Sequence, residues 1–267
     1  FTSPTTRGVL RWDVLEQTVP PAHQFDVTAV HQMFNETAVR AYLRPSSPFF
    51  FSSLREPVAR TDSDLRFLAE LHGTEHYPLS WDERLVLMAQ RRLEFLNPLA
   101  RDLGWYSGVD ISRPLPGDHF VLDKDNDERA VASFIDYIDR TMDLVILTEL
   151  FDEGLVLLMH KLNLTLDDVA NVRMKESFDF DVAPPTAEQL GTLEREYFSV
   201  DKALYDHFVK RFWREWEEHG GDAKLGEEVA ALQARNDELV RVCSLPDALR
   251  EVGDTCPEVV LMDGPET

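Results

Sequence analysis

Apolar residues recur along the chain in two patterns, short continuous runs and longer stretches with helical spacing, which alternate from about residue 25 to residue 183. The continuous runs are bounded by turn residues and predict strands. The clearest are Pro48–Leu54, which holds three consecutive phenylalanines, and Asp143–Thr148. Phe25–Val30 is a third strand candidate, and Asn171–Lys175 is a weaker, partly polar one.

Helices are predicted between and after these runs from start signals and apolar stripes. Pro57 suits the first turn of a helix, and Ser80 with Glu83 resembles a capping box for a helix that reaches about Leu96. The remaining helix predictions are a second box at Thr186 and Gln189, and stripes over Val131–Ile138, Phe151–Leu162, Val200–His219 (ended by Gly220-Gly221) and Leu225–Val242.

The order of these elements predicts an α/β layered domain with a parallel sheet, followed by a helical C-terminal part. Strand candidates are few for such a sheet, and a missing N-terminal strand would explain their number. The predicted organisation is an irregular segment over 1–24, an α/β part over 25–183, a helical part over 184–245 and an acidic tail over 246–267. The length of 267 residues suffices for one large domain or two small ones.

The net charge limits the kinds of partner that the chain is expected to bind. Acidic residues outnumber basic ones by 49 to 27, which gives a net charge of -22. A general nucleic-acid or anionic-membrane binder needs a basic surface, so the chain is predicted to be neither. No apolar run approaches about 18 residues, so no membrane helix is expected among these residues. The chain begins at Phe1 without a leader, which predicts a processed or excised segment with any anchor or signal upstream.

Two cysteines, Cys243 and Cys256, are too few for a zinc finger or a disulfide framework. One bridge between them would suit an oxidising compartment and is left open. No spacing typical of metal ligands occurs, so no metal is expected. The triplets at Asn35 (Asn-Glu-Thr) and Asn163 (Asn-Leu-Thr) would carry glycan in a secretory protein.

The most informative segment is the end of the strand candidate Pro48–Leu54. Arg55 follows this buried strand directly, and a helix begins at once. Ser63 lies eight positions after Arg55, within that helix. Ligands of open α/β sheets bind at the carboxyl ends of strands, and an arginine fork with a nearby hydroxyl suits a phosphate. The alternative is that Arg55 pairs with a surface acid and Ser63 is a helix-surface residue.

This order of strand, arginine, helix and serine resembles the 3′-phosphate-binding motif of sulfotransferases that use the donor PAPS (3′-phosphoadenosine 5′-phosphosulfate). More widely, the chain resembles the galactose 3-O-sulfotransferase family, which includes galactosylceramide (cerebroside) sulfotransferase. The resemblance implies a P-loop-like sulfotransferase domain over about residues 25–245, with Arg55 and Ser63 on the 3′-phosphate of the donor. The stretches that carry it, in the family's order, are Phe25-Asp26-Val27 with His31 and Phe34-Asn35, Leu54–Val58, Asn97-Pro98, Asp102-Leu103-Gly104, Phe134–Ile138, Asp143–Val145, Phe151–Leu158, Leu166–Val169, Leu204–Phe208 and Phe212-Trp213.

The resemblance also implies a catalytic role for His31, which lies where the family has the histidine of a His-Met-Arg-Phe segment. A neutral imidazole is suited to take the proton of an acceptor hydroxyl during in-line sulfuryl transfer. Here the segment continues Gln32-Met33-Phe34, so Met33 replaces the arginine and leaves a charge-stabilising or substrate contact open. A structural or exposed histidine is the alternative.

Acidic residues follow the strand Asp143–Thr148. Glu149 is the candidate for hydrogen bonds to the hydroxyls of a sugar, whereas Asp152 and Glu153 are expected to complement the N-terminus of the next helix. A further group on one long helix is predicted to be core rather than a sugar platform: His207, Phe208, Phe212 and Trp213.

The other half of a donor site is not evident in the sequence. PAPS enzymes of this type carry a Lys-Thr loop after their first strand, whose backbone amides hold the 5′-phosphosulfate at a helix N-terminus. None of the six lysines here is followed by Thr or Ser. The family places that loop upstream of the Phe25 segment, so the chain is expected to cover the middle and C-terminal parts of the domain. Loss of activity in a divergent homologue is the second explanation.

The resemblance implies an enzyme of the Golgi lumen, a type II membrane protein whose anchor lies upstream of these residues. By resemblance it would move a sulfuryl group from PAPS to the 3-hydroxyl of a terminal β-galactose on a glycolipid or glycoprotein, without a metal. A uronic acid 2-hydroxyl is another acceptor within the same class. The competing hypothesis is a non-catalytic, sulfotransferase-like binding domain that lacks the donor loop. The oligomeric state is not predicted.

Overall fold

The computed structural model describes residues 33–43, 47–72, 80–106, 125–172 and 182–242. Tertiary contacts divide the chain into two compact units. Unit 1 comprises Phe1–Val145 and Phe178–Lys210, and unit 2 comprises Ile146–Ser177 and Arg211–Thr267. One boundary falls inside the strand Leu144–Leu147, one inside the helix Ser199–Glu218, and the third, between residues 177 and 178, lies outside the described residues. The domain organisation predicted from the sequence stays a prediction.

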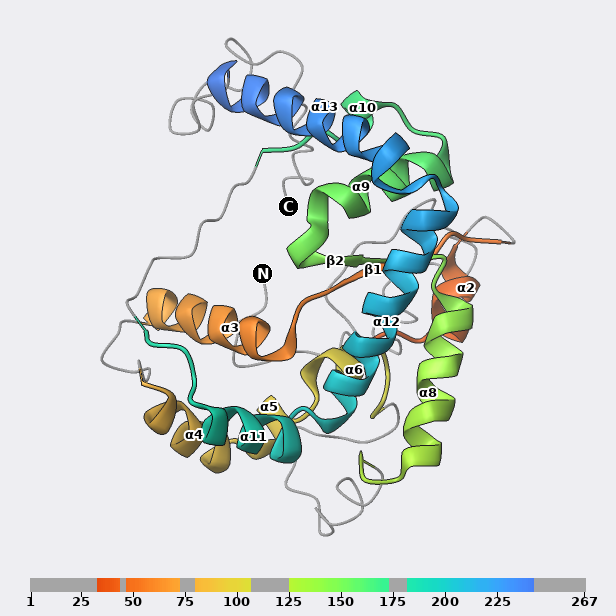
Figure 1. Cartoon of the computed structure of the whole chain (residues 1–267). Coiled ribbons are helices and arrows are strands. Elements are labelled where there is room, and N and C mark those ends of the chain that lie inside the picture. The colour runs from red at the N-terminus through yellow and green to blue at the C-terminus, as the bar shows by residue number, and fades with distance from the viewer. Residues whose placement is uncertain (1–32, 44–46, 73–79, 107–124, 173–181, 243–267) are drawn as a thin grey trace, which may run out of the picture. The chain divides into compact units, whose positions relative to one another are not determined.

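A parallel sheet of two strands, β1 (Phe51–Leu54) and β2 (Leu144–Leu147), is the β structure of the described residues (Figure 1). The pairing begins just before both strands, where the Phe50 N–H donates to the Asp143 carboxylate at 2.7 Å. The Phe50 carbonyl in turn accepts from the Asp143 N–H at 2.8 Å. Every residue of β2 is buried, as its continuous apolar run predicts.

Two strand predictions are therefore confirmed, each shorter than expected. Of the weaker candidate Asn171–Lys175, the first two residues are not in a strand and the other three lie outside the described residues. The candidate Phe25–Val30 also lies outside them. A mostly helical chain with a small parallel sheet is compatible with the α/β class, while the P-loop-like detail and the missing N-terminal strand stay predictions.

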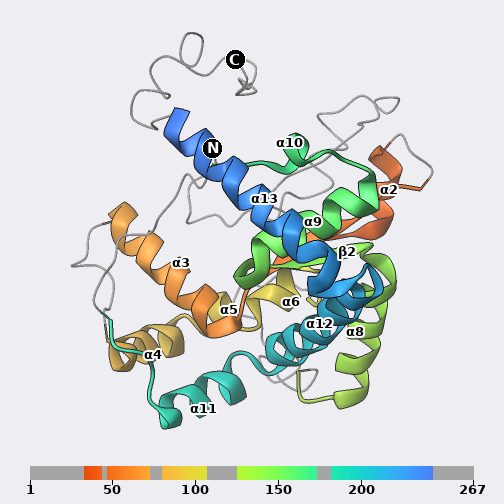
Figure 2. The same ribbon diagram turned by 45° about the horizontal axis from the view of Figure 1, so that its top comes forward.

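Helices make up most of the described part of unit 1, and their apolar faces form its core. Buried side chains of α3, α4 and α5 meet those at the end of α11, and α4 lies beside α11 (Figure 2). The helices of unit 1 are α2 (Glu36–Tyr42), α3 (Pro57–His72), α4 (Trp81–Gln90), α5 (Arg92–Phe95), α6 (Pro98–Asp102), α8 (Glu128–Thr141), α11 (Ala187–Glu196) and the first part of α12 (Ser199–Glu218).

The predicted helix starts are confirmed at both capping boxes. The Ser80 hydroxyl accepts from the Glu83 N–H while the Glu83 carboxylate accepts from the Ser80 N–H, and Thr186 with Gln189 does the same for α11. The prediction of one helix from Ser80 to Leu96 is wrong, because α4 and α5 are separate. Arg91 leaves the helical conformation between them, with φ -121° and ψ 39°.

Unit 2 consists of the 3₁₀ turn η2 (Thr148–Leu150), α9 (Phe151–Leu162), α10 (Leu166–Val169), the rest of α12 and α13 (Gly221–Val242). Helices α9, α10 and α13 pack together (Figure 2). The turn from α12 into α13 uses positive φ at Gly220 (120°) and Gly221 (59°), which explains the predicted glycine pair.

The aromatic residues of α12 are only partly core. Phe208 and Phe212 are buried, and the Phe212 ring lies parallel to Trp216, with centroids 6.5 Å apart. Trp213 is 42% exposed, so the prediction that it is core is wrong. Successive helical residues point about 100° apart, so a residue next to a buried one readily faces outward.

A close approach between α9 and β2 depends on Gly154. A Cβ atom at this position would lie 2.5 Å from Cγ2 of Ile146, which is closer than two carbon atoms can pack. The glycine thus lets the helix rest directly on the strand within unit 2.

We expect Gly154→Ala to lower the free energy of unfolding by about 1–3 kcal/mol, although alanine favours helix by about 1 kcal/mol. Urea unfolding measures the change. Gly226→Ala in α13 is the matched control, since a Cβ there meets nothing within 4 Å. The control should be neutral or slightly stabilising, and equal effects of the two substitutions would contradict the close packing.

Candidate functional site

The carboxyl end of β1 carries Arg55, the predicted phosphate contact. Arg55 and Glu56 connect β1 directly to α3 (Figure 1). The Arg55 side chain is exposed, and it forms no hydrogen bond or ion pair with any described residue.

Ser63 lies six residues beyond the start of α3, which corresponds to about 9 Å along the helix axis. It is half-buried, and its hydroxyl likewise has no hydrogen-bond partner among the described residues. The structure thus places both predicted donor contacts on one strand–helix segment of unit 1, and neither side chain has a polar partner in the described ranges.

The start of α3 is fixed by its own sequence. The Glu56 carboxylate accepts from the Ala59 N–H at 2.7 Å, and the Glu56 carbonyl accepts from the Arg60 N–H at 2.8 Å. Pro57 occupies the first helical position, where its missing N–H leaves no donor unsatisfied. The strand therefore passes into the helix through a defined turn that carries Arg55.

A pocket of about 300 Å³ opens beside the first turns of α3, at the small end of the range for ligand pockets. One acid in its wall, Asp62, is already held by Arg84 and by Arg66, the latter at 2.8 Å. Asp62 therefore does not compete for Arg55. The lining residues are Glu56, Val58, Ala59, Asp62, Trp81, Val182, Pro184 and Pro185.

The predicted sugar contact Glu149 belongs to unit 2. It lies in η2, directly after the carboxyl end of β2, and is exposed. Its contact with a sugar stays a prediction. Asp152, expected to complement the start of α9, lies in the first turn of that helix and is buried. It accepts from Gln233 Nε2 of α13 at 3.0 Å, which gives it a structural partner.

Of the other residues singled out from the sequence, some lie outside the described residues and some lie on the surface. His31, Cys243 and Cys256 lie outside the described residues. Both sequon asparagines are exposed: Asn35 directly precedes α2, and Asn163 ends α9. Their glycosylation stays a prediction.

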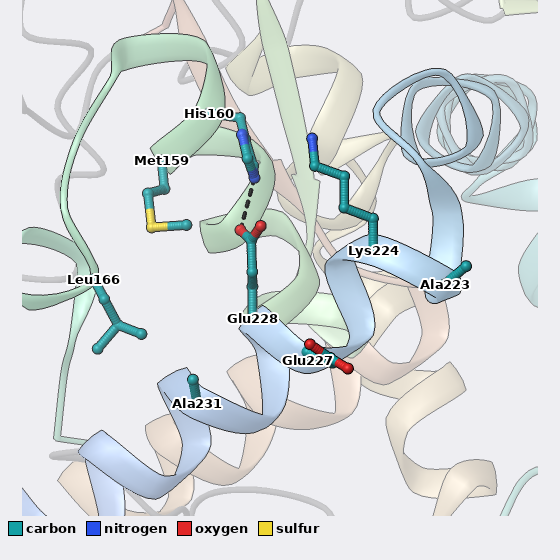
Figure 3. A pocket seen from close by; sticks show the side chains of 8 residues that line it. All are labelled: Met159, His160, Leu166, Ala223, Lys224, Glu227, Glu228 and Ala231. Carbon is teal, nitrogen blue, oxygen red and sulfur yellow. Dashed lines mark hydrogen bonds and ion pairs between the residues drawn. The ribbon is translucent and has the colours of Figure 1, made fainter.

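A second, open groove of about 720 Å³ lies in unit 2 (Figure 3). His160 of α9 and Glu228 of α13 join across it, with 2.7 Å between Nε2 and Oε2. The groove was not predicted from the sequence. Its acid–base pair is already engaged, so it ties two helices together rather than offering a group poised for chemistry. No cluster of three metal-ligating side chains occurs in the described part of the chain.

The most strongly buried polar groups of unit 1 join α6 to α12, and the sequence did not predict this joint. Asn97 Oδ1 accepts from the N–H groups of Val200 and Asp201, at 2.9 and 3.2 Å. The fully buried Asp201 carboxylate accepts from the N–H groups of Leu99 and Ala100, at 3.0 and 2.7 Å. Each helix start is thus capped by a side chain from the other.

Asp125 extends this joint. Its carboxylate accepts from Asn97 Nδ2 at 2.9 Å, from Trp105 Nε1 at 2.6 Å and from the Tyr106 hydroxyl at 2.7 Å. Burial and the nearby Asp125 charge raise the pKa of Tyr106, while burial raises the pKa of Asp201 to about 7. Perturbed groups can mark active sites, but all of these face protein partners, so we assign them to structure.

Comparisons of the sequence with known proteins agree on one class of protein. The family model for Galactose-3-O-sulfotransferase matches residues 10–253. Galactose-3-O-sulfotransferase 2 of Sus scrofa is 29% identical over 227 residues, covering 84% of this chain and 54% of the relative. Galactosylceramide sulfotransferase of Homo sapiens is 27% identical over 244 residues, covering 86% of this chain and 52% of the relative.

The chain thus spans about half the length of the curated relatives it matches. No solved structure matches it. Within the described ranges, no helix is both long and apolar enough to cross a membrane.

We expect Asn97→Ala to lower the free energy of unfolding by about 3 kcal/mol or more, because two buried N–H groups and Asp125 lose partners. Asn163→Ala is the matched control, since both asparagines have positive φ (39° and 53°) but only Asn97 is buried. The control should cost about 1 kcal/mol. Urea unfolding of both variants measures the difference, and similar losses would argue against the joint.

The raised pKa of Asp201 predicts a pH dependence of stability. An aspartate in an unfolded chain ionises near pH 4, so between about pH 4 and 7 only the folded state holds this proton. The resulting stability is complete below about pH 4 and is lost as the pH rises through about 7.

Relative to Asp201→Asn, the wild-type free energy of unfolding should fall by about 1 kcal/mol per pH unit across that window. Urea unfolding at several pH values tests this, with Asp206→Asn on the same helix as a charge-matched control. If the difference in the free energy of unfolding between wild type and Asp201→Asn is constant with pH, the raised pKa of Asp201 is refuted.

Proposed function

The chain belongs to the galactose-3-O-sulfotransferase family, and on this premise we propose that it transfers a sulfuryl group from PAPS to the 3-hydroxyl of a terminal β-galactose on a glycolipid or glycoprotein. The observation that carries the proposal is Arg55, an exposed arginine without a described partner at the carboxyl end of β1. Ligands of α/β sheets bind at this end of the strands.

Arg55 and Ser63 would hold the 3′-phosphate of the donor. In a chain with 49 acidic and 27 basic residues, most described arginines are paired with carboxylates, whereas Arg55 is not. A planar guanidinium fits two phosphate oxygens at once, and the free Ser63 hydroxyl adds a third hydrogen bond. These two residues therefore fit the chemistry of a phosphate.

PAPS supplies an activated sulfuryl group when it is bound. His31 would act as the general base and take the proton from the 3-hydroxyl of galactose while that oxygen forms its bond to sulfur. The bond between sulfur and the bridging oxygen of the donor breaks in the same step, and the desulfated product PAP leaves. Glu149 would accept hydrogen bonds from other hydroxyls of the sugar. This chemistry requires no metal.

A Golgi-lumenal location, with a type II anchor outside this chain, accompanies the proposal, and the exposed Asn35 and Asn163 are accessible to glycosylation. The second candidate function is a non-catalytic, sulfotransferase-like binding domain.

Calorimetric titration with PAP tests the donor site. We expect Arg55→Ala to weaken PAP binding by about tenfold or more, because a hydrogen bond to a charged group contributes about 1.5–3 kcal/mol. Arg55→Lys should recover only part of the loss, since lysine lacks the planar fork.

Arg129→Ala is the matched control for that titration. Arg129 is also exposed and without a described side-chain partner, and it belongs to the same unit. Its removal changes the net charge equally and should leave PAP affinity within about twofold. Equal losses of PAP affinity from Arg55→Ala and Arg129→Ala would contradict the assignment of Arg55 to the donor site. PAP binding without turnover in the full natural protein would favour the non-catalytic candidate.

A further inference from the structure

Glu56 lies between the proposed phosphate contact and the helix that follows it. Arg55 and Glu56 are the two residues that connect β1 to α3. The Glu56 carboxylate accepts from the Ala59 N–H in the first turn of α3, with 2.7 Å between Oε2 and the nitrogen. It forms no ion pair with Arg55, whose side chain has no polar partner among the described residues. The helix start, rather than the neighbouring guanidinium, therefore binds this acid.

The backbone around Glu56 suits a helix cap. Glu56 precedes Pro57, and a residue before proline is restricted to extended conformations, which are also those of an N-cap residue. Pro57 is the first residue of α3 and has no N–H that needs a partner. The Glu56 carbonyl accepts from the Arg60 N–H at 2.8 Å. Glu56 thus contributes both its carbonyl and its side chain to the start of α3.

The chain on both sides of Arg55 is fixed in the core of unit 1. Leu54, the last residue of β1, is 2% exposed, and Val58 in the first turn of α3 is 8% exposed. Val58 packs in the hydrophobic cluster that also contains buried residues of α4 and α11. Between Leu54 and Val58, the Arg55 side chain alone is exposed. The capping hydrogen bond of Glu56 therefore acts on a short connection whose two ends are already held.

We propose that Glu56 is a positioning residue for Arg55: by capping α3 it fixes the turn from which Arg55 extends and keeps its own negative charge off the guanidinium. The inference rests on the proposed function of Arg55. A carboxylate and a phosphate accept from the same N–H donors, so an uncapped Glu56 would compete with the donor for its neighbour. Asp62, further along α3, is engaged in the same way by Arg66 and Arg84.

Calorimetric titration of the full natural protein with PAP tests this role, because positioning and a simple effect of charge predict opposite results. Positioning predicts that Glu56→Ala weakens PAP binding by about threefold or more, since the guanidinium must then be ordered on binding. Glu56→Gln keeps an oxygen that can cap the helix and should stay within about twofold of wild type.

A charge effect alone would make both variants bind PAP more tightly. Two unit charges roughly 7 Å apart in water interact strongly enough to change affinity by about threefold. Tighter binding of PAP by Glu56→Ala, or equal affinities of Glu56→Ala and Glu56→Gln, would overturn the proposal.

Asp127→Ala is the matched control for Glu56→Ala. Asp127 caps α8 in the same unit, where its carboxylate accepts from the Arg129 and Ala130 N–H groups at 3.0 and 3.2 Å. The substitution removes the same charge and the same kind of cap, so urea unfolding should show comparable losses of stability in the two variants. PAP affinity should stay within about twofold in the control. An equal loss of PAP affinity there would assign the effect to stability and overturn the positioning role.

A double-variant cycle shows whether Glu56 acts through Arg55. In the Arg55→Ala background, Glu56→Ala should no longer weaken PAP binding, because no guanidinium remains to be placed. The same loss in both backgrounds would contradict the proposal.

The cycle also identifies which proposal fails. If Arg55→Ala leaves PAP affinity unchanged, the assignment of Arg55 to the donor site fails and takes this inference with it. If Arg55→Ala weakens PAP binding and Glu56→Ala does not, only the inference fails.

Discussion

The reciprocal capping of α6 and α12 by Asn97 and Asp201 is the interaction on which unit 1 depends. A fully buried carboxylate is costly to hold without a cationic partner, and Asp201 instead accepts from two backbone N–H groups. Both helix starts lie in the core, where water cannot satisfy their N–H groups. Replacing either side chain by an apolar one would therefore leave donors unpaired on the opposite helix. The joint is stable because the two helices satisfy each other.

Acidic residues of unit 1 determine which arginines are available. Asp102 engages Arg60, and Asp62 engages Arg66 and the buried Arg84. Arg55, in the connection between β1 and α3, has no such partner among the described residues. The large excess of acid in the composition therefore does not by itself oppose anion binding, because much of the local negative charge is used in ion pairs within the unit. Within the described residues of unit 1, this pairing does not involve the Arg55 guanidinium.

Local features were predictable from the sequence and distant ones were not. The capping box at Ser80 and the glycines that end α12 act within a few residues, and each was found where its pattern indicated. Asn97 and Asp201 lie about 100 residues apart and have no pattern that links them, so their pairing emerges only from tertiary structure. The prediction that Trp213 is buried was wrong for a related reason. An apolar residue type indicates a preference for burial, but the helix face that is buried is decided by the partners of that helix.

Arg55 and Ser63 were singled out from the sequence because their chemistry and spacing match a recurring pattern, and their role stays a prediction. Gly154 was not singled out, because a glycine acts through what its missing side chain allows. Arg55 and Ser63 both belong to unit 1. The two proposed donor contacts therefore depend on one compact core and on its buried joint. Glu149, the proposed sugar contact, belongs to unit 2. If Arg55 and Ser63 hold the donor as proposed, donor affinity should follow the integrity of unit 1.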